Sequence, residues 1–377
     1  MTAIGSCAFY GCSGLTSIVI PNSVTHIGGS AFSNCTGLTS ISISNNVSFI
    51  DWGTFSGCTA LTSVIIPNSV TNITDFAFAG CTNLSSVTIP NSVKNIGRNA
   101  FGGCSGLVSV TIPNSVTSIG EGAFSYTGLT SIKFPDSVTS IGHYAFLKCR
   151  ELTSVDIPNS VTHIGDEAFR ECSNLTSLTL SDGLLSFGEY AFLGCSALAS
   201  VTIPNNVMAI GNYAFGECDG LTSVSIPKSV TLIGNGAFAC PNITSVNSEI
   251  VDVYDIDESV FDYRVYDEAT LYVPSGTIDS YKRADGWRYF MNISDNTYGS
   301  SPILNAPLAD VIYQNNAIVI TGAEGSMAKV YNLSGQLMLN KVLTEPQERI
   351  AFKTKGSYVV RIEKDDEIIM RKTIIVE

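Results

Sequence analysis

A repeat of 23 residues fills about the first 245 residues of this 377-residue chain and limits its fold more than any other feature. Its consensus is L-T-S-[VI]-x-I-P-N-S-V-T-x-I-G-x-x-A-F-x-x-C-x-x, so that each copy carries one Phe. These residues follow at steps of 23, with a single step of 22, and are Phe9, Phe32, Phe55, Phe78, Phe101, Phe124, Phe146, Phe169, Phe192, Phe215 and Phe238. A unit this short cannot bury its own apolar face, so neighbouring units must stack into a common core.

Within one repeat, apolar and polar residues alternate before a Pro, which predicts a short strand that ends at the Pro. In the first full repeat the inward residues of the strand and of a second edge are Leu15, Ile18, Ile20, Val24 and Ile27. We expect Ala31 and Phe32 to lie on a helical turn that closes the coil. The sequence therefore predicts a β-rich solenoid of about eleven to twelve 23-residue coils with a parallel sheet.

The repeated text IPNSVTSIGxxAFxxCxxLTSV resembles the BspA-like leucine-rich repeats of bacterial surface proteins. The resemblance covers residues 1 to about 245, with eleven near-identical copies. It implies a non-catalytic, secreted or surface-attached protein on the bacterial outer surface. It also implies an adhesin-like role, in which the solenoid binds a protein ligand such as host extracellular matrix or another bacterial surface protein.

The solenoid is expected to span residues 1–293, with a degenerate last repeat and a cap at 247–293. Residues 269–293 resemble the segment that closes such arrays, and they predict a strand at Leu271–Val273 followed by a short helix from near Ser275. The apolar residues expected to cover the open end of the core are Ile278, Tyr281, Trp287 and Phe290.

After this cap, a polar linker is expected at 294–308 and a small antiparallel β-sandwich at 309–377. The β-sandwich sequence resembles the C-terminal sorting domains of type IX secretion substrates. That family usually has a Pro-Gly-x-Tyr turn, where this chain has Lys355, Gly356, Ser357 and Tyr358. The alternative interpretation is a small accessory β domain without a sorting role.

Composition and the chain start constrain partners and location. Only 14% of residues are charged and the net charge is −13, which argues against nucleic acid or an anionic membrane as a partner. No apolar run is long enough to span a bilayer, so we expect no transmembrane segment. The chain starts within a repeat and shows no signal peptide, so we expect N-terminal sequence to be missing.

Nine of the eleven Cys residues occupy one column, three residues after the repeat Phe. They are Cys12, Cys35, Cys58, Cys81, Cys104, Cys149, Cys172, Cys195 and Cys218, while Cys240 is offset by one and Cys7 stands alone. Parallel side chains in a stack hold Cβ atoms at about 4.8 Å, farther apart than the roughly 3.8 Å of a disulfide. We therefore expect free, buried thiols with no metal or redox role.

The sequence offers no catalytic constellation. Its three His residues, at 26, 143 and 163, fall on outward or turn positions without a neighbouring nucleophile and orienting group. Hydrolase, metalloprotease, dinucleotide and P-loop motifs are absent, and so is the C-x-x-C spacing of zinc sites. The acidic stretch 248–268 lacks the spacing of a calcium loop and is interpreted as a solvated loop. We expect no enzyme activity, no cofactor and no metal.

The outward residues of the strands are the first candidate for a binding surface. One outward column is Ser in every repeat, and we interpret it as structural because hydroxyl groups can hydrogen-bond along a ladder. The next column varies, and its only charged members are Lys133 and Asp156 on adjacent coils. We predict that these two residues contact the ligand. The alternative is that they form an exposed ion pair without a binding role.

The variable turns are the second candidate, and their residues are Tyr144, Asp166, Glu167, Tyr190 and Tyr213. Together with Phe76 and Trp52, the aromatic residues there leave a second function open, because glycan-binding proteins present exposed aromatic platforms. This alternative is a glycan- or nutrient-binding surface protein. In either case we expect a monomer.

Overall fold

The computed structural model describes residues 1–295, 310–314, 317–321, 325–332, 337–345, 347–351, 355–364 and 367–376. The chain divides into two compact units, Met1–Asp295 and Asn296–Glu377. Most of the linker predicted at 294–308 lies outside the described residues, but its first two residues end the last strand of the first unit.

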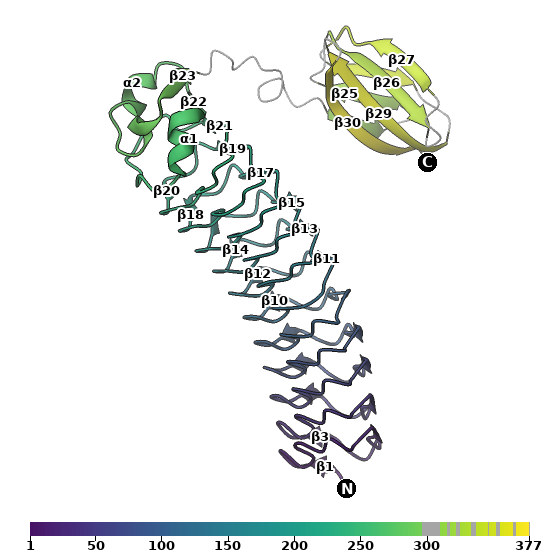
Figure 1. Ribbon diagram of the computed structural model, residues 1–377. Helices are drawn as coiled ribbons and strands as arrows, with labels where there is room; N and C mark the ends of the chain where they lie inside the picture. The colour runs from purple at the N-terminus through teal and green to yellow at the C-terminus, as the bar shows by residue number, and fades with distance from the viewer. Residues whose placement is uncertain are drawn as a thin grey trace. The chain divides into compact units, whose positions relative to one another are not determined.

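The first unit is a solenoid whose coils carry two rows of parallel strands along separate edges (Figure 1). The first row comes mostly from the L-T-S motif and contains β2 (Ser17–Val19), β4 (Ser40–Ser42), β6 (Ser63–Ile65), β8 (Ser86–Thr88), β11 (Ser131–Lys133), β13 (Ser154–Asp156), β15 (Ser177–Thr179), β17 (Ser200–Thr202), β19 (Ser223–Ile226), β21 (Ser245–Ser248), β22 (Thr270–Val273) and β23 (Asn292–Asp295). The predicted solenoid with a parallel sheet is confirmed.

The second row was anticipated only as an inward edge, and it is the more continuous one. It contains β1 (Ala3–Ile4), β3 (His26–Ile27), β5 (Phe49–Ile50), β7 (Asn72–Ile73), β9 (Asn95–Ile96), β10 (Ser118–Ile119), β12 (Ser140–Ile141), β14 (His163–Ile164), β16 (Ser186–Phe187), β18 (Ala209–Ile210) and β20 (Leu232–Ile233). From β5 to β20 these strands form one nine-stranded sheet. The first row is divided into sheets of two, two, three and five strands, with no strand at 108–112.

Conserved polar positions of the repeat connect successive coils. The hydroxyl group of Thr39, from the L-T-S motif, donates to the carbonyl oxygen of Thr16 one coil earlier at 3.0 Å. The hydroxyl group of Ser69, from the N-S-V motif, donates to the carbonyl oxygen of Val47 at 2.6 Å. The Ser column of the strands was predicted to form such a ladder, but this was wrong. Within the described residues its hydroxyl groups make no hydrogen bond, because they point out of the sheet while the Thr before them points along the stack.

The segment around the repeat Phe is a series of tight turns and not the predicted helical turn. The backbone N–H of Ala31 donates to the carbonyl oxygen of Gly28 within the same coil at 3.1 Å. The next N–H, of Phe32, donates to the carbonyl oxygen of Thr54 in the following coil at 2.9 Å. Alternate N–H groups thus bond within a turn and between coils, whereas an α-helix would direct each of them four residues back.

In the core, each apolar residue of the repeat stacks on the corresponding residue of the next coil. The Phe rings stack without interruption from Phe9 to Phe261, and neighbouring centroids lie 5.0 to 5.8 Å apart. Even the short step from Phe124 to Phe146 keeps this contact, with 5.6 Å between centroids. Leu, Ile and Val of the consensus fill the space between the Phe ladder and the two rows of strands. Each such buried side chain contributes roughly 1.5–3 kcal/mol before entropy is counted.

The C-terminal end of the solenoid is closed by α1 (Tyr263–Glu268), α2 (Ile278–Tyr281) and the 3₁₀ helix η1 (Trp287–Tyr289) (Figure 1). The side chains of Tyr281 and Trp287 are fully buried. The indole N–H of Trp287 donates to the carbonyl oxygen of Tyr254 at 3.0 Å, and the Phe290 ring packs edge-on against Phe261 at 5.3 Å. The acidic stretch was interpreted as a solvated loop, but part of it forms α1, whose N-cap is Asp262.

The second unit is a small β-sandwich. Its strands are β24 (Asp310–Gln314), β25 (Ala317–Thr321), β26 (Met327–Asn332), β27 (Leu337–Val342), β28 (Gln347–Ala351), β29 (Gly356–Lys364) and β30 (Glu367–Val376). They form two antiparallel sheets, ordered β24-β25-β28 and β27-β26-β29-β30. Apolar side chains from both sheets share one core, including Ile318, Val330 and Val360. The predicted antiparallel fold of this part of the chain is confirmed.

Candidate functional site

The predicted strand-face residues Lys133 and Asp156 are direct register partners on β11 and β13. Both side chains are exposed, as are most other members of the variable column. The two residues form no ion pair in the part of the chain that the structure describes, so the alternative interpretation as a simple ion pair does not hold. The binding role predicted for Lys133 and Asp156 stays a prediction.

Two turn positions in each coil have the backbone in the left-handed region, with φ between 48° and 73°. The pre-Phe column lies two residues before the repeat Phe and contains Cys7, Ser30, Gly53, Phe76, Asn99, Gly122, Tyr144, Glu167, Tyr190, Tyr213 and Gly236. The post-Phe column lies two residues after it and contains Gly11, Asn34, Gly57, Gly80, Gly103, Tyr126, Lys148, Glu171, Gly194 and Glu217. Gly adopts this conformation freely, whereas most other residues lose roughly 1–2 kcal/mol there.

The predicted tyrosines of the pre-Phe column are stacked along the solenoid. The rings of Tyr190 and Tyr213 are parallel within 3°, with 5.4 Å between centroids. On its other side Tyr213 covers Gly236, where a Cβ atom would lie 2.3 Å from a ring carbon. Tyr213 thus stacks on Tyr190 and lies close to Gly236, while 37% of it stays exposed. Tyr144 is 36% exposed, about as much as Tyr213 at 37%.

The predicted carboxylates in these turns already have partners. Asp166 accepts a hydrogen bond from the backbone N–H of Glu189 at 2.9 Å, and its other oxygen lies 3.2 Å from Nδ1 of His143. Glu167 pairs with Arg170 at 2.8 Å. Asp166 therefore orders the turn of the next coil, and Glu167 balances a neighbouring charge.

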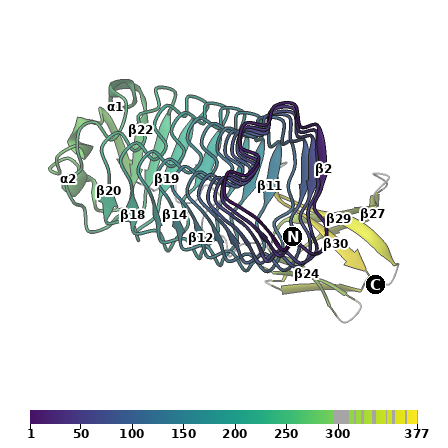
Figure 2. The same cartoon turned by 90° about the horizontal axis from the view of Figure 1, so that it is seen from below.

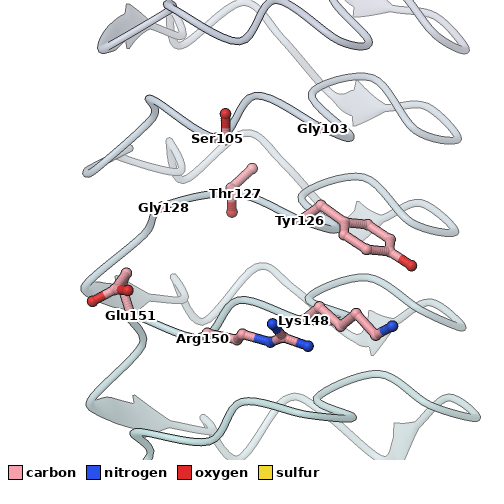
Figure 3. Close-up of a pocket in the computed structure, with 8 residues that line it drawn as sticks. All are labelled: Gly103, Ser105, Tyr126, Thr127, Gly128, Lys148, Arg150 and Glu151. Carbon is pink, nitrogen blue, oxygen red and sulfur yellow. The ribbon is translucent and has the colours of Figure 1, made fainter.

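An open depression of about 450 Å³ lies across three successive coils where the 22-residue step occurs (Figure 3). It is lined by Gly103, Ser105, Tyr126, Thr127, Gly128, Lys148, Arg150 and Glu151. In most coils a Ser or Thr follows the Cys position, as Ser105 does, but the short coil passes directly from Thr127 to Gly128. The missing residue leaves a gap in this column between Ser105 and Arg150, and the depression occupies it.

The charges at the depression are organised by Glu171 of the next coil. Its carboxylate accepts a hydrogen bond from Nη2 of Arg150 at 2.7 Å and lies 3.4 Å from Nζ of Lys148. The hydrogen bond from Arg150, followed by the contact with Lys148, holds the pKa of Glu171 below its ordinary value although partial burial opposes this. The ammonium group of Lys148 also lies 5.5 Å from the ring centroid of Tyr126, in cation–π range.

None of the residues predicted for the site lines this depression. Two signals in the sequence pointed to it. One is the single step of 22, and the other is the run Tyr126, Lys148 and Glu171 in a column that carries Gly in five other coils. Left-handed backbone at bulky residues is a conformational cost that often accompanies function. Recognising the second signal required the backbone angles, which the sequence alone does not reveal.

Comparison with protein families gives matches to the BspA type leucine-rich repeat region, a model of six copies, at residues 1–107, 71–196 and 162–281. Together these matches extend without a gap over residues 1–281, which is well over half of the chain. The chain belongs to the BspA-type leucine-rich repeat family. A search of curated proteins gives no match.

Solved structures of other leucine-rich repeat proteins resemble this BspA-type chain. A leucine-rich repeat protein from Bacteroides ovatus is 31% identical over 66% of this chain and 82% of its own, with a TM-score of 0.41. A leucine-rich cell surface protein from Faecalibacterium prausnitzii is 30% identical over 78% and 83%, with a TM-score of 0.48. The pneumococcal vaccine antigen PcpA is 20% identical over 78% and 69%, with a TM-score of 0.49.

The structure also bears on metal sites, membrane spans and thiols of the BspA-type chain. Within the ranges that the structure describes, no group of three His, Cys, Asp or Glu side chains is placed to hold a metal ion. No helix there combines the length and hydropathy that a membrane span requires. All eleven Cys residues are free thiols, and nine of them are buried.

Proposed function

We propose that this BspA-type chain is a non-catalytic surface protein whose solenoid binds a protein ligand in an adhesin-like manner. The observation that carries the proposal is the depression at the short coil, where Tyr126, Lys148 and Glu171 occupy left-handed positions that Gly fills in other coils. Tyr and Arg are among the residues that dominate the energetics of protein interfaces; Arg150 lines the depression, and Tyr126 is held there at a conformational cost. Family membership supports the same conclusion, since a related structure is described as a cell surface protein.

The test is a binding screen of the purified chain against host matrix proteins and bacterial surface proteins on one array. The expected result is saturable binding to a protein ligand, reduced by substitutions at the depression. The sheet face with Lys133 and Asp156 and the turns with Tyr144 and Asp166 are the competing locations. Absence of binding to any protein on the array, together with binding to glycans, would contradict the proposal.

A glycan- or nutrient-binding role is the second candidate. The observation in its favour is Trp52, which is 56% exposed and contacts Phe76 edge-on with 6.0 Å between centroids. An exposed indole face is a platform on which a sugar ring can stack. A glycan array with Trp52→Ala as the comparison tests this role. The stacking of Tyr213 on Tyr190 makes these two residues poorer platforms.

The β-sandwich is proposed to act as a sorting domain that brings the chain to the outer surface. Its support is the resemblance of the sequence around Lys355–Tyr358 to type IX sorting domains. Replacing residues 309–377 by an unrelated β domain should abolish surface exposure of the solenoid in the native host, as measured by protease accessibility on intact cells. Unchanged surface exposure would identify the unit as an accessory domain instead.

A further inference from the structure

We infer that the depression between Tyr126 and Arg150 binds an acidic side chain from an extended segment of the protein partner. The inference rests on the proposed protein-binding function and names the chemistry that this one site would recognise. Figure 3 shows the basic side chains of Lys148 and Arg150 on one coil and the ring of Tyr126 on the coil before it.

The contacts of Glu171 indicate that the two basic residues are arranged for a carboxylate. One carboxylate oxygen binds the guanidinium group of Arg150 at 2.7 Å, and the other lies 3.4 Å from the ammonium group of Lys148. The contact with Arg150 has the length of a charge-assisted hydrogen bond, and the contact with Lys148 is a longer ion pair. Glu171 therefore acts as a carboxylate of the protein itself, held where a ligand carboxylate would compete with it.

Both basic residues keep donors for a further acceptor. A guanidinium group has five N–H donors and an ammonium group has three, and one carboxylate cannot use them all. The side chain of Arg150 is 60% exposed and lines the depression, so N–H donors that Glu171 does not use are accessible to a ligand. Glu151 is the one acidic residue of the lining, and Figure 3 shows its carboxylate directed away from Lys148.

The form of the depression favours a peptide as the source of the carboxylate. The depression is open and extends over three successive coils, which gives room for an extended segment of a partner. Gly128 is one of its lining residues, and a Cβ atom there would lie 2.4 Å from the carbonyl oxygen of Ser105 in the preceding coil. Gly128 is therefore required for the stacking of the two coils, as the equivalent Gly37 and Gly106 are elsewhere in the solenoid. The ring of Tyr126 is 50% exposed and offers an apolar contact beside the two cations.

Charge distribution excludes a polyanion as the preferred ligand. Residues 1–295 contain 24 acidic and 11 basic residues, a net charge of −13. A sulfated glycan or a nucleic acid needs many cations and would be repelled by this solenoid. A single Asp or Glu in an otherwise uncharged segment needs only the two cations of the depression. The local preference is thus for one carboxylate and not for high negative charge.

The test measures binding of capped peptides to the full chain by biolayer interferometry. The probes are an uncharged Gly-Ser-Tyr peptide with one central Glu and the same peptide with Gln at that position. The Glu peptide should bind at least about tenfold more tightly, as expected for a charge-assisted contact. Lys148→Gln with Arg150→Gln should remove this preference, while Glu171→Gln should strengthen binding of the Glu peptide because it removes the competing carboxylate.

Lys94→Gln with Lys228→Gln is the charge-matched control, because both side chains are exposed on other coils. This control should bind like the wild type. Equal binding of the Glu and Gln peptides, or stronger binding of a heparin-type oligosaccharide than of the Glu peptide, would overturn the inference. If the peptide test fails but the wild type binds a protein on the array, only the inference about the depression is wrong and the proposed function stands. If the wild type binds no protein on the array, the proposed function itself is contradicted.

Discussion

The thiol sulfur of Cys58 lies 3.1 Å from the carbonyl oxygen of Phe32, one coil earlier. The same contact recurs between each buried Cys and the repeat Phe of the preceding coil, for example from Cys172 to Phe146 at 3.3 Å. The thiol thus satisfies a carbonyl group inside the stack in addition to filling space. In the short coil Thr127 takes the Cys position, but its hydroxyl group donates to the carbonyl oxygen of Phe124 in its own coil at 2.8 Å.

The first prediction concerns thiol reactivity. Burial raises the pKa of the thiols of Cys35, Cys58, Cys149, Cys172 and Cys195, to about 11 for Cys149, so they resist formation of the reactive thiolate. In native protein at mild alkaline pH, a chromogenic disulfide reagent should react rapidly only with the exposed Cys7 and Cys12. After unfolding in guanidinium, all eleven should react. Fewer than eleven free thiols in the unfolded chain would show that disulfides form, contrary to this structure.

The second prediction concerns the left-handed columns. Gly80→Ala places a Cβ in a left-handed backbone with φ of 70° and no close neighbour, so its cost is purely conformational. The free energy of unfolding should fall by roughly 1–2 kcal/mol, measured by urea denaturation. Gly14→Ala is the control, because it has open space and lacks the left-handed φ, and it should be neutral. Equal effects of the two substitutions would argue against the turn geometry.

The third prediction concerns the cap. Trp287→Ala removes a fully buried indole and should lower the free energy of unfolding by about 3–5 kcal/mol. It should also expose the apolar end of the last coil, so that the protein associates, which light scattering would detect. Trp52→Ala removes an indole that is 56% exposed and should leave both properties unchanged. A monomeric, fully stable Trp287→Ala protein would mean that this residue caps nothing.

The fourth prediction concerns the pH dependence at Glu171. Its pKa is lowered in the folded state by the hydrogen bond from Arg150, so its stabilising contribution is complete above the usual Glu value of about 4.3. The contribution is lost as the pH falls through the lower folded-state pKa. Because the pair is partly exposed, it amounts to less than about 1 kcal/mol. Glu171→Gln should be less stable than the wild type at pH 7, and the difference should vanish in acid.

The sequence predicted the repetitive core because each 23-residue unit has apolar residues at the same positions, and these can be buried only if the units stack. It did not predict the turns correctly, because alternate N–H groups around the repeat Phe, such as that of Phe32, donate to the following coil. Long-range bonds of this kind leave no local periodicity. The sequence also failed to identify Tyr126 and Lys148 as site residues. Their backbone has the same left-handed angles as Gly57 and Gly80, and these angles cannot be read from the sequence.

Two separate surfaces are candidates for the binding site. One is the strand face around Lys133 and Asp156, and the other is the depression at the short coil. Replacing Lys133 and Asp156 by Trp should leave thermal stability unchanged, because both side chains are exposed. If the depression is the site, this double variant should also retain binding to the protein ligand found on the array. Reduced binding would return the site to the strand face.

The most direct measurement inserts one Ser between Thr127 and Gly128, which restores the 23-residue step and fills the depression while every charged residue stays in place. The variant is compared with the wild type for binding to the same protein ligand, with circular dichroism and thermal unfolding as checks of the fold. We predict a folded solenoid whose affinity falls by at least about tenfold, which corresponds to the loss of one well-packed contact. A folded insertion variant that binds as tightly as the wild type would contradict the account.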